Sequence, residues 1–460
     1  LVVVGTGPGG YVAAIRGAQL GMSVAVIERE NLGGICLNWG CIPTKALLRS
    51  AEVYHLAKTS KEFGFKIKDI EIDINAIVKR SRRVAKQLNN GVGLLLKKNK
   101  VDVLNGHGRL LGEGRIGVEV DGTQVMEVSA KYIILAAGAR ARDLPTMEAD
   151  GKQIWNYRHA LVADVIPKRL LVVGSGAIGI EFASFFNTLG SEVTVVELLD
   201  RVLPVEDEEI SAMAHKVFEK QGMRILTDVQ VKALKKTKDS VTASIKTADG
   251  KAESIVVDRV IMAVGIIGNV EDLGLENTKV KVDRSHVEVD QWQATGEPGV
   301  FAIGDLAGPP WLAHKASHEG VVCVEKIAEV TDIHPLEPMN IPGCTYCLPQ
   351  VASVGLTEAA AKVAGHEVRV GRFPFIGNGK AIALGDPEGM IKTVFDKTTG
   401  ELLGAHMIGP EVTELIQGYV VARTLEITEA ELLHTVFPHP TLSEAMHESI
   451  LDAMDRAIHF

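Results

Sequence analysis

The sequence predicts an α/β fold with two Rossmann-like dinucleotide-binding domains followed by a C-terminal α+β domain. A strand, glycine-rich turn, helix and strand occur together twice, and the hydrophobic pattern changes after about residue 340. The 460 residues are also too many for one hydrophobic core. The net charge of -9 argues against nucleic acid or an anionic membrane surface as partner. No apolar run reaches the ~18 residues that span a bilayer.

The first dinucleotide-binding unit begins with the chain. A buried strand, Val2-Val3-Val4, leads into Gly5-Thr6-Gly7-Pro8-Gly9-Gly10 and a helix, and a second strand ends at Glu28. Gly5 permits the tight turn, Gly7 lets a pyrophosphate approach the helix N-terminus, and Gly10 lets the helix pack closely on the strand. Glu28 is expected to accept a hydrogen bond from a ribose hydroxyl.

A second copy of this unit lies further along the chain. The three glycines and the terminal acid recur as Gly174, Gly176, Gly179 and Glu197, all at one constant offset of 169 residues. Four chemically matched positions at one offset predict a second dinucleotide site. The alternative is a repeat of the fold that binds no second nucleotide.

Two cysteines follow the first unit directly. Cys36 and Cys41 lie in a glycine-rich loop, and Lys45 follows where a helix is expected to begin. The positive end of a helix dipole and a nearby cation both favour a thiolate over a thiol. Gly34 allows close approach of the backbone to another group. The pattern predicts a reactive thiol pair; the alternative is a buried or stabilising pair.

The position of the cysteines assigns the two nucleotides. A dithiol does not pass a hydride to a nicotinamide efficiently, whereas a flavin accepts two electrons from sulfur and returns a hydride. We therefore expect FAD at the first unit, beside Cys36 and Cys41, and NAD at the second. Glu197 disfavours NADP because a carboxylate repels a 2′-phosphate, although Arg201 lies near the same strand end.

The segment between the two units is expected to be helical and basic over residues 51–100, and then to form short strands. Its basic residues indicate a solvated helix face: Lys79, Arg80, Arg82, Arg83 and Lys86. Sheet strands are expected at 132–138 and 259–265, each ending beside a nucleotide. A buried strand over 300–305 ends in Asp305, whose carboxylate could bind the polyol of a flavin.

The C-terminal portion shows strand-like runs followed by two helices, which indicates a compact α+β domain. Near its end, His439 is fixed between two prolines, and Glu444 lies five residues further on. A hydrogen bond between them would set the tautomer of the imidazole and leave its other nitrogen to act as a base. The alternative is a structural histidine.

The five cysteines are too few and too scattered for a secreted disulfide framework, so a reducing compartment is expected. Cys344 and Cys347 have CxxC spacing, but no second pair completes a metal site, and we predict no metal. The chain enters a strand at once and has no initiator Met, so we expect it to be trimmed, with a targeting segment as one candidate for the lost part.

Two motifs carry a family resemblance: Gly33-Gly34-x-Cys36-Leu37-Asn38-x-Gly40-Cys41-Ile42-Pro43-x-Lys45 and His439-Pro440-Thr441-x-Ser443-Glu444. They resemble the class I pyridine nucleotide-disulfide oxidoreductases, most closely the dihydrolipoamide dehydrogenases (the E3 components of 2-oxoacid dehydrogenase complexes). The resemblance implies oxidation of protein-bound dihydrolipoamide to lipoamide with NAD, through FAD and a Cys36/Cys41 disulfide.

The resemblance also implies partners and a location. It implies a homodimer in which His439 and Glu444 reach the cysteines of the other subunit, with lipoyl domains and the E2 core as partners. The expected location is the bacterial cytoplasm, with the mitochondrial matrix as the alternative. Which 2-oxoacid complex is served does not follow from the sequence.

The resemblance divides the chain into an FAD-binding domain, an NAD-binding domain, a central domain completing the FAD site and a dimerisation domain: 1–140, 141–262, 263–338 and 339–460. The implied catalytic residues are Cys36, Cys41, His439, Glu444, Lys45 and Glu181. The expected cofactor-binding residues are Gly5, Gly7, Gly9, Gly10, Glu28, Gly34, Lys45, Gly108, Gly138, Asp305, Ala313, Gly174, Gly176, Gly179, Glu197, Val231 and Gly265.

Two closing motifs depart from the family pattern. The usual Ala-Thr-Gly-Ser is Ala136-Ala137-Gly138-Ala139, and the usual Gly-Arg-x-Pro-Asn is Gly265-Ile266-Ile267-Gly268-Asn269, which lacks a cation and a proline. Related reductases are the first alternative: glutathione and trypanothione reductases use NADPH, mercuric and large thioredoxin reductases carry extra C-terminal thiols, and a soluble transhydrogenase lacks the cysteine pair. A non-catalytic flavoprotein scaffold is the second.

Overall fold

The computed structural model describes residues 1–460, and their contacts divide the chain into two compact units. Unit 1 comprises Leu1–Ala46, Ala76–Arg142 and Gly265–Leu336, and unit 2 comprises Leu47–Asn75, Asp143–Val264 and Glu337–Phe460. We describe each unit by itself. The predicted division into four domains stays a prediction.

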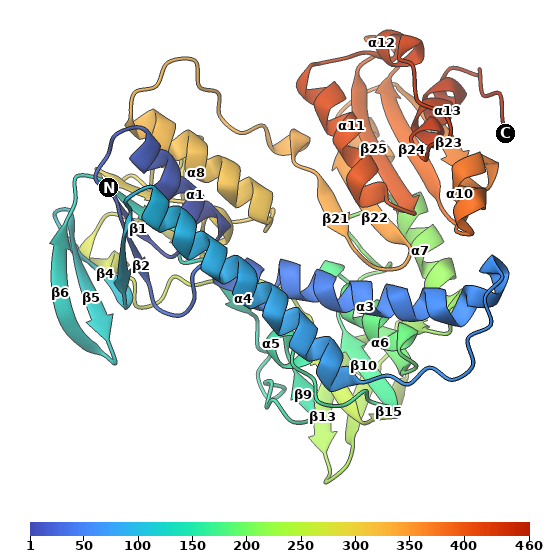
Figure 1. Ribbon diagram of the computed structural model, residues 1–460, viewed down its shortest axis with the longest axis horizontal. Helices are drawn as coiled ribbons and strands as arrows, with labels where there is room; N and C mark the ends of the chain where they lie inside the picture. The colour runs from blue at the N-terminus through green and yellow to red at the C-terminus, as the bar shows by residue number, and fades with distance from the viewer. The chain divides into compact units, whose positions relative to one another are not determined.

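Unit 1 is built on a five-stranded parallel sheet in the order β20-β7-β1-β2-β3. Its strands are β1 (Val2–Val4), β2 (Ala25–Glu28), β3 (Asp102–Asn105), β7 (Ile133–Leu135) and β20 (Val300–Ala302). Helices α1 (Pro8–Gln19) and α8 (Ala313–Ile327) lie side by side against the face that carries Val3 (Figure 1). A Cβ on Gly320 would lie 2.7 Å from the Gly9 carbonyl oxygen, so glycine is required for these helices to pack so closely.

The opposite face of this sheet carries Val2 and Val4, because side chains alternate along a strand. They share a hydrophobic core with Ile116 and Val118 of an antiparallel sheet. That sheet consists of β4 (His107–Gly112), β5 (Arg115–Val120) and β6 (Thr123–Ser129). The parallel strands are therefore buried on both faces, as their continuous hydrophobic runs indicate.

The remaining elements of unit 1 are short, apart from one long helix. They are α2 (Gly34–Trp39), the start of α3 (Cys41–Thr59), most of α4 (Ile74–Lys98), the pairs β8 (Ala139–Ala141) with β17 (Ile266–Gly268) and β18 (Val282–Asp283) with β19 (His286–Val287), and the 3-10 turns η2 (Leu275–Asn277) and η3 (Gly304–Ala307). Two of them, α2 and the start of α3, carry the cysteine pair.

Unit 2 contains a second parallel sheet, in the order β12-β11-β10-β16-β9. Its strands are β9 (Ile154–Trp155), β10 (Arg169–Val173), β11 (Glu192–Val196), β12 (Arg224–Leu226) and β16 (Arg259–Met262). The register repeats that of unit 1 at the sequence offset, since Val2 pairs with Ala25 and Leu171 pairs with Thr194. The other elements here are α5 (Tyr157–Ala160), α6 (Ala177–Thr188), α7 (Glu208–Lys220) and the antiparallel strands β13 (Gln230–Lys236), β14 (Val241–Lys246) and β15 (Ala252–Val257).

The C-terminal part of unit 2 is an antiparallel sheet in the order β21-β22-β25-β24-β23. Its strands are β21 (Gly343–Thr345), β22 (Gln350–Gly355), β23 (Val368–Pro374), β24 (Met390–Asp396) and β25 (Leu402–Gly409). The accompanying helices are α9 (Glu358–Val363), α10 (Gly379–Leu384), α11 (Val412–Thr424), α12 (Glu429–His434) and α13 (Glu444–Ala453), with 3-10 turns η1 (Ser60–Phe63), η4 (Pro338–Asn340) and η5 (Phe375–Gly377) elsewhere in the unit. Buried Phe373, Phe395 and Tyr419 anchor its core.

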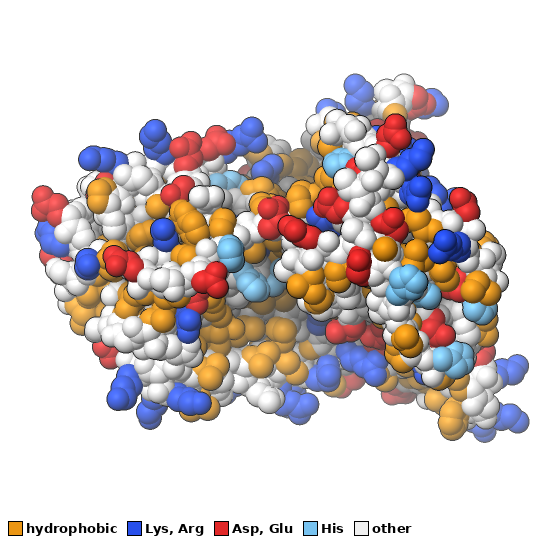
Figure 2. Space-filling view, turned by 90° about the horizontal axis from the view of Figure 1, so that it is seen from above, with side chains coloured by type: hydrophobic (Ala, Val, Ile, Leu, Met, Phe, Trp, Pro, Cys, Tyr) orange, Lys and Arg blue, Asp and Glu red, His pale blue; other side chains and the backbone are white.

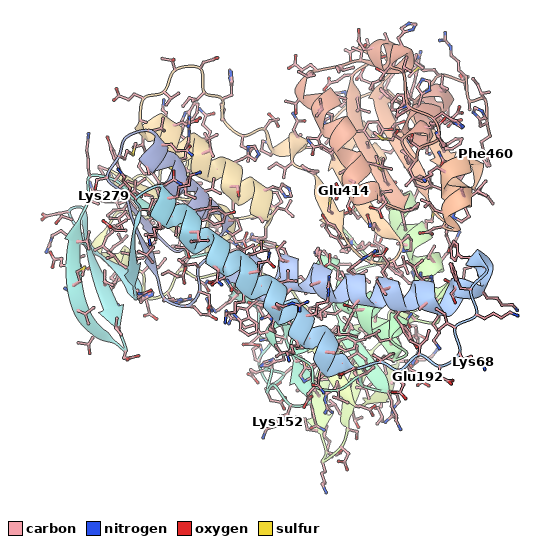
Figure 3. All side chains as sticks on the ribbon, in the orientation of Figure 1. Lys68, Lys152, Glu192, Lys279, Glu414 and Phe460 are labelled. Atoms are coloured by element: carbon pink, nitrogen blue, oxygen red, sulfur yellow. The ribbon has the colours of Figure 1, made fainter.

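The surface carries the charged residues. On the face in Figure 2, acidic and basic side chains are interspersed with hydrophobic ones. Lys68, Lys152 and Glu192 are among the exposed side chains of unit 2 (Figure 3). None of the helices combines the length and the apolar character needed to cross a membrane. The predicted fold class is confirmed: two Rossmann-like units and a C-terminal α+β domain.

Candidate functional site

The two glycine turns have the same geometry. A Cβ on Gly10 would lie 2.0 Å from the Gly5 carbonyl oxygen, and a Cβ on Gly179 would lie 2.0 Å from that of Gly174. Gly5 and Gly174 themselves have φ of +97° and +98°, which L side chains rarely adopt. In both units only glycine lets the helix pack this closely against the turn.

The middle glycine of each turn has a different environment. Gly7 and Gly176 cap α1 and α6, and no heavy atom lies within 4 Å of where their Cβ would be. The open space lies in front of a helix N-terminus, where backbone N–H groups and the dipole favour an anion. The residues present therefore fit a dinucleotide pyrophosphate in each unit.

The acid at the end of each second strand is held back to its own glycine turn. Glu28 Oε2 accepts hydrogen bonds from Thr6 N at 2.9 Å and Thr6 Oγ1 at 2.6 Å. Glu197 Oε2 accepts from Ser175 N at 2.8 Å and Ser175 Oγ at 2.7 Å. These contacts fix each carboxylate beside its turn. Sequence reasoning missed the two hydroxyls, although Thr6 and Ser175 obey the same offset as the glycines.

A cleft of about 590 Å³ opens beside the first acid. Its lining includes Glu28, Asn105, Gly106 and His107, which follow the carboxyl ends of β2 and β3. In open parallel sheets, ligands bind at this end of the strands. The cleft is thus suited to the nucleoside end of the predicted FAD.

The cysteine segment packs directly on the first glycine turn. A Cβ on Gly34 would lie 2.7 Å from Gly7 Cα, and Gly33 N donates to Thr6 O at 2.9 Å. The predicted loop is largely helical: Cys36 lies within α2, and Cys41 is the first residue of α3. The prediction that Cys36 lies in a loop is therefore wrong, whereas the helix start is correctly expected at the second cysteine.

The structure brings the two cysteines together. A hydrogen bond with Cys41, followed by burial, raises the pKa of the Cys36 thiol, while the charge of Lys45 opposes this effect. The thiolate expected from the helix dipole is therefore not favoured at Cys36 in this dithiol. A proton shared between two close sulfurs is held more tightly than the proton of a single thiol.

Asp305 lies in η3, directly after β20. Burial raises the pKa of its carboxyl to about 6, although the positive charge of Lys315 opposes this rise. Lys315 forms a buried ion pair with Glu319 at 2.8 Å, and Glu319 accepts a hydrogen bond from Gly304 N at 2.7 Å. This network holds the η3 backbone in place beneath the predicted polyol ligand.

The other predicted cofactor residues lie at ends of elements or in close packing. Gly138 and Gly265 have φ of +68° and +98°, and Asn269 donates from N to Gly138 O at 2.9 Å in the atypical closing motif. Ala313 begins α8, Gly108 packs against Val4, and Val231 is buried in β13. Nothing in their geometry tests their contact with a cofactor, so their roles stay predictions.

Glu181 is a buried residue of α6, and its Oε1 accepts a hydrogen bond from Tyr346 N at 2.9 Å. The carboxylate is thus anchored within unit 2. Its predicted place near the flavin ring, together with Lys45 of unit 1, stays a prediction.

His439 and Glu444 form the predicted pair. His439 Nδ1 lies 2.9 Å from Glu444 Oε1, and Glu444 Oε2 accepts from Thr441 N at 2.9 Å. Burial opposes ionisation of Glu444, but the hydrogen bonds from Thr441 and His439 outweigh it and lower the pKa of this carboxyl. The imidazole is 78% exposed and directs its other nitrogen outward, as a base acting on an external substrate requires.

Comparisons with known proteins agree with this arrangement. The model of the Pyridine nucleotide-disulphide oxidoreductase family matches residues 1–320, and that of its dimerisation domain matches residues 341–450. Dihydrolipoyl dehydrogenase of Rhizobium etli is 56% identical over 473 residues, covering 100% of this chain and 98% of the relative. That of Zymomonas mobilis is 55% identical, covering 100% and 99%. The crystal structure of LpdA from Mycobacterium tuberculosis has a TM-score of 0.91 and 27% identity, covering 98% of each chain.

Proposed function

Because the chain belongs to the pyridine nucleotide-disulphide oxidoreductase family, it is a flavoprotein disulfide oxidoreductase, and we propose that Cys36 and Cys41 form its redox-active pair. The enzyme is of the dihydrolipoyl dehydrogenase type and uses FAD and NAD. The observation that carries the proposal is the packing of Gly34 on Gly7, which sets the two hydrogen-bonded thiols beside a dinucleotide turn.

The protein is a homodimer through its dimerisation domain. The finer proposal is that His439 and Glu444 of one subunit act on the cysteine pair of the other. The physiological substrates are proposed to be lipoyl domains bound to the E2 core of a 2-oxoacid dehydrogenase complex. A bacterial cytoplasmic location is also proposed, because the similar curated relatives are bacterial.

The proposed chemistry begins with proton removal. The outward nitrogen of His439 takes a proton from one thiol of dihydrolipoamide, and Glu444 stabilises the resulting imidazolium through Nδ1. The substrate thiolate attacks Cys36 Sγ of the disulfide, a mixed disulfide forms, and Cys41 leaves as a thiolate. The second substrate thiolate then attacks the substrate sulfur of the mixed disulfide. Lipoamide is released oxidised, and Cys36 and Cys41 hold the electron pair as a reduced dithiol.

Residues of both units would hold the two cofactors. Glu28 and the first glycine turn would hold FAD, with Asp305 on its polyol and Lys45 and Glu181 near its ring, and Glu197 with the second turn would hold NAD. Bound FAD supplies two-electron chemistry that connects a dithiol to a nicotinamide. The chain itself keeps Cys41 at the N-terminus of α3, where the helix dipole favours its thiolate.

A substitution series tests this proposal. Cys41→Ser removes the leaving thiolate and should abolish NAD-dependent oxidation of dihydrolipoamide. Cys344→Ser, at a half-buried cysteine outside the site, should leave turnover unchanged. Lipoamide and glutathione disulfide should each be assayed with NADH and NADPH. Full turnover by Cys41→Ser, or a preference for glutathione disulfide with NADPH, would contradict the proposed function.

A further inference from the structure

Helix α4 holds the cysteine segment through three consecutive residues. Each donates a side-chain hydrogen bond to a backbone carbonyl of α2 or of the start of α3. The contacts are Arg80 Nη1 to Ala46 O at 2.8 Å, Ser81 Oγ to Pro43 O at 3.0 Å and Arg82 Nη2 to Asn38 O at 2.6 Å. One turn further along, Asn89 Nδ2 donates to Leu32 O at 2.8 Å. The bonded carbonyls lie on both sides of the Cys36–Cys41 interval.

Arg82 makes the most specific of these contacts. Its guanidinium carbon lies 4.7 Å from the centroid of the Trp39 ring, within the range of a cation–π contact. Burial lowers the pKa of Arg82, which is half-buried, whereas Lys79, Arg83 and Lys86 on the same helix are exposed. The predicted solvated helix face is therefore correct for those residues but wrong for Arg82.

The contact lies at the C-terminal end of α2. The last carbonyls of a helix lack partners within the helix, and a cation is favoured there by the helix dipole. Trp39 is held on its other side, because its Nε1 donates to Glu30 Oε1 at 3.0 Å. Glu30 N in turn donates to Glu28 Oε1 at 2.8 Å. The end of α2 is thus fixed between Arg82 and the segment that follows the ribose-binding acid.

We propose that Arg82 is a positioning residue for the redox pair, which holds the end of α2 so that Cys36 stays at bonding distance from Cys41. This inference rests on the proposed function, since it gives the two cysteines a disulfide to form. A disulfide requires Cα atoms about 4.4–6.8 Å apart, and only four residues separate these cysteines. Holding the backbone on both sides raises the effective concentration of one thiol toward the other.

The expected consequence is a change in redox equilibrium. Reduction by dithiothreitol transfers two electrons and two protons to the pair, converting the Cys36–Cys41 bond to two thiols while dithiothreitol closes to its cyclic disulfide. Loss of the contact should lower the effective concentration of the thiols about tenfold and so favour reduction by the same factor. A tenfold change corresponds to about 30 mV toward a more positive potential.

The test compares Arg82→Gln, Arg82→Lys and the matched control Arg83→Gln, which changes an exposed arginine one position away. Each flavin-containing holoenzyme is equilibrated in dithiothreitol redox buffers without air, quenched in acid and alkylated, and the disulfide fraction is measured by mass. Arg82→Gln should be reduced about tenfold more readily, Arg82→Lys should lie between it and the parent, and Arg83→Gln should match the parent. Equal equilibria for Arg82→Gln and Arg83→Gln would overturn the inference.

A second variant guards against a folding defect. Trp39→Leu removes the stacked ring from the other side and should shift the same equilibrium in the same direction. If Arg82→Gln does not fold, an unchanged equilibrium for Trp39→Leu overturns the inference. If the parent protein forms no Cys36–Cys41 disulfide, the proposed function fails instead, so the two failures are distinguishable.

Discussion

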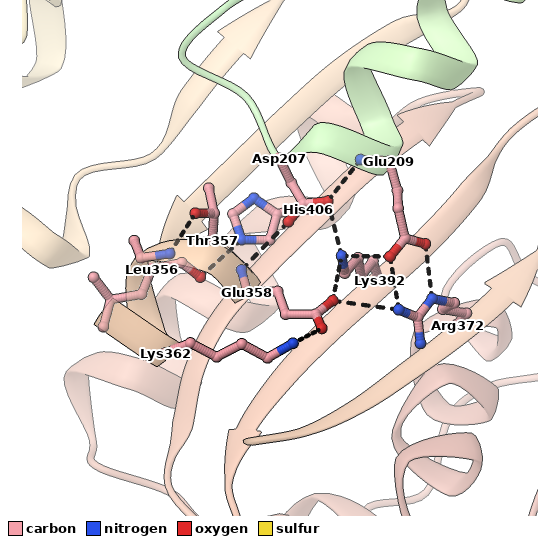
Figure 4. A network of polar contacts seen from close by, with 10 residues as sticks. Asp207, Glu209, Leu356, Thr357, Glu358, Lys362, Arg372, Lys392 and His406 are labelled. Carbon is pink, nitrogen blue, oxygen red and sulfur yellow. Dashed lines mark hydrogen bonds and ion pairs between the residues drawn. The ribbon is translucent and has the colours of Figure 1, made fainter. Parts of the chain in front are cut away.

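Replacing Lys392 by Met should destabilise unit 2, because it leaves a buried carboxylate without its charge partner. Lys392 Nζ lies 2.9 Å from Asp207 Oδ1, 2.7 Å from Glu209 Oε1 and 2.8 Å from Glu358 Oε2 (Figure 4). The side chains of Lys392 and Asp207 are each only 2% exposed, so neither solvent nor salt screens this pair.

The geometry indicates which carboxylate suffers. Arg372 also binds Glu209, at 2.7 and 2.6 Å, and reaches Glu358 at 3.3 Å, so these two keep a cation after the change. Asp207 keeps only backbone donors, Glu209 N at 3.1 Å and Glu358 N at 3.3 Å. Removing one partner of a buried pair costs about 3–5 kcal/mol, and the remaining hydrogen bonds favour the lower end.

Thermal unfolding followed by calorimetry measures this loss. For a unit of 150–250 residues, 1 kcal/mol shifts Tm by about 2–4 °C, so Lys392→Met should lose roughly 6–12 °C. The double variant Asp207→Asn with Lys392→Met should recover most of it, because Asn still caps α7 and leaves no buried charge. An unchanged Tm for the single variant, or a double variant no more stable than the single one, would refute this reasoning.

Three further predictions test other sites. Arg372 holds the pKa of Glu209 at about 2, below its usual 4.5, so this contribution to stability is complete above about pH 4.5 and is lost as the pH falls toward 2; the acid-induced fall in Tm should be shallower for Glu209→Gln. Gly7→Ala should fold, because its Cβ meets no neighbour within 4 Å, yet lose bound flavin, whereas Gly176→Ala should retain flavin absorbance and raise the KM for NAD at least about tenfold; the reverse pattern would invert the nucleotide assignment. Glu197→Gln should raise kcat/KM for NADPH relative to NADH by about tenfold, and an unchanged ratio would contradict the role of this carboxylate.

The sequence was most informative where one residue type is required by backbone geometry. Gly5 and Gly10 must be glycine because a Cβ would lie 2.3 Å and 2.0 Å from carbonyl oxygens, so a short motif predicts both the turn and its ligand. The His439–Glu444 pair was likewise predictable from local spacing. Patterns of this kind depend on residues close together in the chain.

Contacts between distant segments were not predictable in the same way. Arg82 contacts Asn38, which lies 44 residues earlier, and nothing in the basic stretch distinguishes it from its exposed neighbour Arg83. The periodicity of α4 shows only which residues share a helix face. Which arginine becomes buried depends on where α2 packs, and this is a property of the tertiary structure.

The repeated units show that selectivity for FAD or NAD arises outside the repeat. Their glycine turns and carboxylate contacts are the same, so those features cannot discriminate between the nucleotides. What differs is the segment after each acid. After Glu28 the chain returns to the turn and covers it with α2, so that a Cβ on Gly34 would lie 2.7 Å from Gly7 Cα. Such closure favours a resident ligand.

After Glu197, by contrast, the chain remains at the surface. Leu198 and Leu199 are 62% and 52% exposed, and Arg201 is paired with Asp200 at 3.0 Å instead of extending alone toward a 2′-phosphate. The chain returns to the turn only at Leu203, whose N donates to Ser175 O at 3.1 Å. An uncovered rim of this kind lets a nucleotide enter and leave in every turnover. The same supersecondary unit can therefore hold one dinucleotide permanently and exchange another, because the two connecting segments differ in whether they cover the turn.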